Sequence, residues 1–287
     1  MHIRAARGDP DGLRIVERSN WVGRALVFPR AAWAQPSVAT RPELQQTGVY
    51  LLLGPREDGE GDRLYIGEGD PIKPRLATHH SGNAQKDFWT RAICFVSMGQ
   101  GLNKAHVQFL EANLIRLAKQ AKRVPLDVEN KKNETEPTLS EADRADMQVF
   151  LQHMLGMLPV LGVHAFEQPP QAPAASVPEL TCKGKGLVAR GYESTQGFVV
   201  KAGSQAMGKV AQSLLHHFPG TVAKRQELID LGVLAQQGSA YMFTQDYAFT
   251  SPSLASSVVL GRSSNGRQDW KDAQGRALKV LQENEPI

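Results

Sequence analysis

The chain has 287 residues, a length typical of two domains, and its hydrophobic fraction of 41% is enough for ordinary globular cores. A formal net charge of +4 and an isoelectric point of about 9.1 are compatible with a polyanionic partner. No apolar run approaches the length of a membrane span, and the first residues are charged rather than signal-like, so we expect a soluble, cytoplasmic protein without a membrane partner. The two cysteines, Cys94 and Cys182, lie far apart and form no motif, which argues against a zinc site and for a reducing compartment.

Residues 1–46 are predicted to form a β-rich extension. A short hairpin with GDPDG as its turn is followed by a third strand that ends in ALVFPR. This segment is too short to bury a core of its own, so we expect it to pack onto the next domain.

Residues 48–67, GVYLLLGPREDGEGDRLYIG, predict a β-hairpin, because two apolar runs flank a turn of Gly, Asp, Glu, Arg and Pro. Side chains alternate between the faces of a strand, so Tyr50 and Tyr65 can point the same way. Gly48 and Gly67 border them, and glycine lets a backbone or a ligand come close. The two phenols form either a cross-strand aromatic pair or part of a site.

The stretch GDPIKPRLATHH, residues 69–80, predicts a helix with Asp70 as its cap and a proline in its first turn. Arg75 and His79 are four residues apart and therefore share a face of this helix. Arginine suits phosphate oxygens, whereas the alternative is an ordinary solvent-exposed pair.

A strand is predicted at 90–96, followed by a strong helix at 103–121 with Asn103 as its N-cap. Glu111 stands on an otherwise apolar stripe of that helix. A carboxylate there is costly unless it is paired or binds a cation, so we weigh a structural ion pair against a ligand for a hard divalent metal.

Residues 131–166 are predicted to be a helical extension, with an amphipathic helix that begins at Ser140. Residues 167–179 are rich in Pro and Ala, which is typical of an exposed linker, and we place the domain boundary there.

Residues 180–287 are predicted to be a second, mixed α+β domain. We expect two strands within 186–204, helices at 204–218 and 221–234 with Gly232 ending the second, and a strand followed by a helix capped by Ser251 within 239–261. No catalytic spacing is evident, so this domain is predicted to bind. The candidates for phosphate contact and stacking are Arg262, Asn265, Arg267, Trp270 and Lys271, and the alternative is a helix end with the tryptophan packed in the core.

Over residues 47–130 the sequence resembles the GIY-YIG nuclease family. GVY and YIG match the two motifs that name the family, with valine for the usual isoleucine. Five positions fall in the family's order: Tyr50, Tyr65, Arg75, His79 and Glu111. The resemblance implies a small α/β sandwich on a three-stranded antiparallel sheet.

The resemblance also implies a site and an activity. The family adds an asparagine after the glutamate helix, for which Asn130 is our choice and Asn113 and Asn133 compete. The implied activity is metal-dependent endonucleolytic cleavage of DNA. Glu111 would hold Mg²⁺ or Mn²⁺, Arg75 would neutralise the phosphate, and the base is one of Tyr50, Tyr65 and His79.

Two other functions stay open from the sequence. One is a non-catalytic nucleic-acid-binding protein on a nuclease scaffold, and the other is a nuclease directed at RNA. Residues 180–283 resemble a domain of unknown function that often follows such nucleases, carried by GFVVKAGS, SPSLASSVVLG and NGRQDWKDAQG. The last two phrases distantly resemble modules that accompany adenine methylases and are predicted to bind modified DNA. This domain would recognise nucleic acid or a partner.

Overall fold

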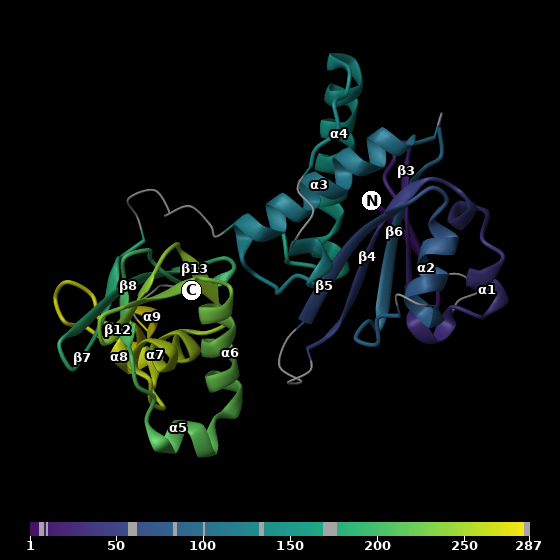
Figure 1. Ribbon diagram of the computed structural model, residues 1–287. Coiled ribbons are helices and arrows are strands. Elements are labelled where there is room, and N and C mark those ends of the chain that lie inside the picture. The colour runs from purple at the N-terminus through teal and green to yellow at the C-terminus, as the bar shows by residue number, and fades with distance from the viewer. Residues whose placement is uncertain are drawn as a thin grey trace. The chain divides into compact units, whose positions relative to one another are not determined.

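The computed structural model describes residues 1–5, 9, 11–56, 62–82, 85–99, 101–131, 135–168 and 177–283. The chain forms two compact units, Met1–Glu167 and Gln168–Ile287, which divide at the start of the predicted linker (Figure 1). Most of that linker, and with it Asn133 further upstream, lies outside the described residues.

The first unit contains one antiparallel sheet of six strands in the order β1-β2-β3-β6-β4-β5. The strands are β1 His2–Ala5, β2 Arg14–Glu17, β3 Gly23–Pro29, β4 Gly48–Pro55, β5 Asp62–Gly69 and β6 Arg91–Ser97. The three strands expected from the sequence are the neighbours β6, β4 and β5. The N-terminal extension continues their sheet, because β3 pairs with β6 from Gly23↔Ser97 to Pro29↔Arg91.

Helices cover both faces of this sheet (Figure 1). Alternate residues of β4 divide between two cores. Val49 and Leu51 pack with α3 (Lys104–Ala121) and α4 (Glu141–Met157), whereas Tyr50 and Leu52 pack with α2 (Ile72–Ser81). The helices are α1 Pro36–Ala39, α2 Ile72–Ser81, α3 Lys104–Ala121 and α4 Glu141–Met157, and the 3-10 turns are η2 Arg30–Ala32, η3 Pro42–Gln45, η4 Glu129–Lys131 and η5 Pro159–Leu161. Among the described residues, no helix combines the length and the hydropathy that crossing a bilayer requires.

The helix starts follow the capping rules at two of the three expected positions. The Asn103 side chain accepts from His106 N at the start of α3, and the Ser140 hydroxyl accepts from Asp143 N at the start of α4. The predicted Asp70 cap of α2 is wrong. Pro71 occupies the cap position, and the Asp70 carboxylate instead accepts from the Thr47 hydroxyl at 2.5 Å.

The second unit is mixed α+β with two antiparallel sheets around one core. The first sheet has the order β13-β9-β8-β7, with β7 Leu180–Gly184, β8 Leu187–Ser194, β9 Gly197–Val200 and β13 Tyr247–Phe249. The second has the order β10-β12-β11, with β10 Gln205–Met207, β11 Leu234–Gln237 and β12 Ala240–Phe243. Its helices are α5 Gln212–His217, α6 Pro219–Asp230, α7 Pro252–Leu260, α8 Gly266–Asp269 and α9 Leu278–Glu283.

Two sequence predictions in this unit are wrong. The helix expected at 204–218 begins only at Gln212, because Gln205–Met207 pairs with β12 as a strand. The segment 239–261 holds two strands before α7 rather than one. The Ser251 cap of α7 is confirmed, since its side chain accepts from Leu254 N.

Candidate active site

The two tyrosines lie on one face of the β4–β5 pair, as the alternation predicts. Tyr50 lies opposite Gly67 and Leu52 lies opposite Tyr65, so the two phenols are diagonal neighbours. Their ring centroids are 6.2 Å apart. Both are buried in the core beneath α2.

Gly67 makes room for the Tyr50 ring. A Cβ added at Gly67 would lie 2.6 Å from Tyr50 Cζ and 2.6 Å from its Oη, far inside van der Waals contact. The glycine of the YIG motif therefore serves the tyrosine on the opposite strand.

Helix α2 adds His79 and Arg75 to this face. His79 is 1% exposed, and its Nε2 lies 2.9 Å from Tyr50 Oη in a buried hydrogen bond. Its ring also meets Tyr65 edge-on, at a centroid distance of 4.9 Å. Arg75, one turn earlier, is exposed, and its charge interacts with the buried Tyr50 phenol.

Burial keeps both phenols neutral in the absence of a cation. It raises the pKa of Tyr65 to about 12, with the Glu129 charge adding to the effect, and raises the pKa of Tyr50 well above 10. Arg75 lowers both pKa values, but by less than burial raises them. A phenolate at neutral pH therefore requires more positive charge than Arg75 provides.

Glu111 reaches the same site from α3. Burial, and then the charge of Glu68, raises the pKa of the Glu111 carboxyl from 4.5 to about 7. Lys104, Arg75 and the Glu68 backbone N–H act in the opposite direction and lower the pKa. Glu111 is thus a half-buried carboxylate without enough neighbouring positive charge to offset its burial. The structural ion pair that the sequence left open is absent among the described contacts.

Glu68 is a site residue that the sequence reasoning missed. It directly follows the YIG motif on β5, so it alternates to the α3 face and lies beside Glu111. One carboxylate oxygen pairs with the Lys104 ammonium, and the other, Oε2, is buried without a hydrogen-bond partner among the described residues. The alternation of β5, extended one residue past the motif, would have found it.

Asn130 lies beside strand β5, and its side chain is hydrogen-bonded to the backbone of that strand. Its Oδ1 accepts from Ile66 N at 2.7 Å, and its Nδ2 donates to Ile66 O at 2.7 Å. The side chain therefore saturates the exposed edge of β5 and positions the strand that carries Tyr65. The competing Asn113 is buried in α3 and donates to Phe109 O at 2.9 Å.

Lys86 is a second residue that the sequence reasoning missed. Its ammonium lies 4.3 Å from the centroid of the Tyr65 ring and is only 8% exposed. It is held there by Asp127 at 3.0 Å and Glu129 at 3.1 Å. Its loop position gave no periodic signal.

The site straddles strand β5, the edge of the sheet. Tyr50, Tyr65, His79 and Arg75 lie on the α2 face, and Glu68 and Glu111 lie on the α3 face. Electrostatic contact between Arg75 and Glu111 connects the two sets. The arrangement places two carboxylates, an exposed arginine and a phenol–imidazole pair around one strand edge.

The donor set fits one hard divalent cation. The raised pKa of Glu111 and the unpartnered oxygen of Glu68 both indicate a deficit of positive charge, and carboxylate oxygen is the ligand that Mg²⁺ and Mn²⁺ prefer. Within the described residues no group of three or more His, Cys, Asp or Glu side chains gathers, so such an ion would keep several water ligands.

The five C-terminal candidates do not form a stacking surface. Trp270 is fully buried, 4.5 Å from the Phe198 ring between centroids, and its Nε1 donates to Pro252 O. Asn265 caps α8, and Arg267 donates to Gln282. The core alternative is therefore correct for the tryptophan.

Comparison with known proteins identifies one region. Residues 180–282 match the family model of a domain of unknown function (DUF4357). The match covers the second unit and none of the residues of the candidate active site. No curated protein and no solved structure shows a significant match to the chain.

Proposed function

We propose that the first unit is a metal-dependent endonuclease that hydrolyses phosphodiester bonds in DNA, with a site like that of the GIY-YIG nucleases. The observation that carries the proposal is the juxtaposition of Tyr50, His79, Arg75 and Glu111 at one strand edge. These residues come from strand β4 and helices α2 and α3, and their types match the needs of phosphodiester hydrolysis.

Glu111, with Glu68 beside it, would hold Mg²⁺ or Mn²⁺. The bound ion supplies Lewis-acid stabilisation of the phosphate and lowers the pKa of a coordinated water. The Glu68 backbone N–H favours the ionised form of Glu111, and Lys104 partly neutralises the two carboxylates.

Arg75 binds the scissile phosphate. Its exposed guanidinium provides a fork of donors at the mouth of the site and neutralises charge that builds on the non-bridging oxygens.

The Tyr50–His79 pair moves the proton. Because the pKa of Tyr50 is raised, a free phenolate is unfavourable, and a direct transfer avoids it. Tyr50 Oη takes the proton of the attacking water as its own proton passes to His79 Nε2, 2.9 Å away. The new P–O bond forms as the bond to the leaving oxygen breaks.

A cleavage assay tests the proposal. The wild-type protein is incubated with supercoiled plasmid, single-stranded DNA and RNA of one sequence, in Mg²⁺, Mn²⁺ or EDTA. We expect metal-dependent cutting of DNA, with nicking of plasmid first if one site acts alone. Preferential cutting of RNA would favour the RNA-directed alternative. If no substrate is cut with either metal, the alternative of a non-catalytic nucleic-acid-binding protein is favoured.

A further inference from the structure

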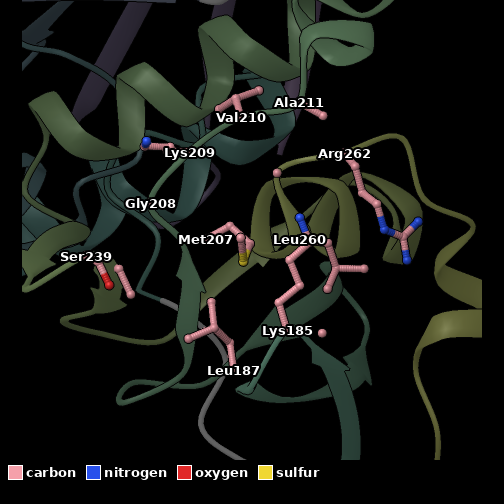
Figure 2. Close-up of a pocket in the computed structure, with 13 residues that line it drawn as sticks. Lys185, Leu187, Met207, Gly208, Lys209, Val210, Ala211, Ser239, Leu260 and Arg262 are labelled. Carbon is pink, nitrogen blue, oxygen red and sulfur yellow. The ribbon is translucent and has the colours of Figure 1, made fainter.

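A pocket in the second unit lies where its two sheets meet the end of α7 (Figure 2). It has a volume of about 460 Å³. The β7–β8 turn, the segment after β10, the β11–β12 turn and the C-terminal end of α7 line it. This volume is within the range of small-molecule sites.

The lining carries positive charge only. Among the described residues that line it, the charged ones are Lys185, Lys209 and Arg262, and none is acidic. Both lysines are exposed and have no ion pair or hydrogen bond from their ammonium groups among the described residues. Arg262 has one carboxylate nearby, that of Asp269 at 3.7 Å.

The cations surround an apolar floor. In Figure 2 Met207 and Leu260 lie near the centre of the lining residues, the Lys185 side chain extends toward them, and Lys209 and Arg262 lie on opposite sides of the view. Ser239 adds a hydroxyl at the rim. The pocket therefore presents apolar surface for a flat or compact group and cations for anions attached to it.

Hydrogen bonds connect the elements that carry the floor residues Met207 and Leu260. The buried guanidinium of Arg225 donates to Met207 O at the end of β10 and to Val258 O in α7. Ala211 N donates to Gly261 O at 2.7 Å, which ties the segment after β10 to the end of α7. The walls thus come from elements that are held together before any ligand arrives.

We infer that this pocket binds one nucleotide of a single-stranded or locally opened nucleic-acid strand, with the base on the Met207–Leu260 floor and the flanking phosphates on the three cations. That the ligand is a nucleic acid rests on the proposed function. That it binds in this pocket rests on the charge and shape of the pocket. Because the lining residues that the structure describes include no aromatic side chain, the base is held by van der Waals contact rather than by stacking.

The test measures binding of the full-length protein in EDTA, which prevents cleavage. The probe is a short fluorescein-labelled single-stranded DNA, compared with an abasic strand of equal length. The Lys185→Gln/Lys209→Gln variant removes two phosphate contacts, so its salt slope, log K against log salt, should flatten by about 1.4. Lys183→Gln/Lys279→Gln removes two exposed charges outside the pocket and is the matched control, expected to keep the wild-type slope.

A second variant tests the apolar floor. Ala211→Leu narrows the pocket and keeps every charge. We expect the wild type to bind the base-bearing strand several-fold more tightly than the abasic strand, and Ala211→Leu to lose that preference while its salt slope stays unchanged. Circular dichroism of each variant confirms that it is folded.

The outcomes separate this inference from the proposed function. Equal slopes for both double variants, or binding of a phosphoserine peptide in place of the strand, overturn the pocket assignment even where the wild type cuts DNA. Pocket-dependent strand binding by a protein that cuts nothing supports the pocket and removes the nuclease proposal.

Discussion

Tyr50 is the residue on which the candidate site converges. It is fully buried, lies opposite Gly67, is hydrogen-bonded to His79 and interacts with the charge of Arg75. The ring packs in the core beside Tyr65, and the hydroxyl is hydrogen-bonded to His79, so packing in an aromatic pair and the proposed role in the site are compatible at this position.

Removing only the hydroxyl separates the two roles. We expect Tyr50→Phe to lower the cleavage rate by about 10²–10⁴-fold, the range for loss of a proton-transfer group, and to leave strand binding in EDTA unchanged. The measurement is single-turnover cleavage with Mn²⁺. A rate within a factor of two of wild type would exclude Tyr50 from proton transfer.

The raised pKa of Glu111 gives a pH dependence of stability. Below pH 4.5 the carboxyl is protonated in both the folded and the unfolded chain. Between about pH 4.5 and 7 the unfolded chain releases the proton while the folded chain retains it, so the free energy of unfolding falls as the pH rises. Glu111→Gln cannot ionise. In EDTA we expect it to gain on the order of 1–3 kcal/mol relative to wild type between pH 5 and pH 8.

Urea denaturation at the two pH values measures this gain. Saturating Mn²⁺ provides the control, because it stabilises the wild type and has no effect on the variant. A stability difference that is the same at pH 5 and pH 8 would contradict the raised pKa.

At the scale of elements, strand β5 organises the site. One of its edges pairs with β4. At the other edge Leu64 N donates to the Pro125 carbonyl and Ile66 N to the Asn130 amide, and the Glu111 carboxylate lies beside Glu68. Glu111, the proposed cation ligand, therefore lies at the free edge of the strand that carries Tyr65.

Gly67 lets this strand pass beneath Tyr50. We expect Gly67→Ala to destabilise the protein by about 1–3 kcal/mol, the cost of overpacking, and to reduce cleavage by displacing the phenol. Gly99→Ala is the control: an added Cβ there lies 3.6 Å from Val22, so we expect a change within about 0.5 kcal/mol. Thermal melting compares them, and equal effects would mean that the Tyr50 contact is relieved without cost.

The elements that the sequence predicted well are those with local signals. The β4–β5 hairpin follows from alternation and its polar turn, and α3 follows from its apolar stripe and the Asn103 cap. The prediction that Asp70 caps α2 is wrong because its carboxylate instead accepts a hydrogen bond from Thr47, which is distant in sequence. The prediction of a helix over 204–218 is wrong for Gln205–Met207 because pairing with β12, a tertiary contact, outweighs the local helix propensity.

At the scale of the whole molecule, long-range pairing accounts for what the sequence did not predict. The β3–β6 register joins residues about seventy positions apart and turns an extension into half of a six-stranded sheet. Five site residues were predicted in order, whereas Glu68 and Lys86 required the positions of α3 and the 125–131 segment. The burial of Trp270, at the end of α8, likewise depends on Phe198 of β9.

The two units divide the work in this account. The first carries carboxylates, an arginine and a proton-transfer pair, whereas the second, which matches DUF4357, carries a cation-rimmed pocket. Cutting in the first unit and holding the strand in the second can therefore be lost independently by substitution.

The most direct test of the central claim is DNA cleavage in Mg²⁺ or Mn²⁺ by wild type, Glu111→Gln and Glu141→Gln. Glu141 is an exposed glutamate of the same unit, at the start of α4, and serves as the matched control. The account predicts metal-dependent cleavage by wild type and Glu141→Gln and none by Glu111→Gln, with strand binding in EDTA equal in all three. Cleavage that survives in Glu111→Gln would contradict it.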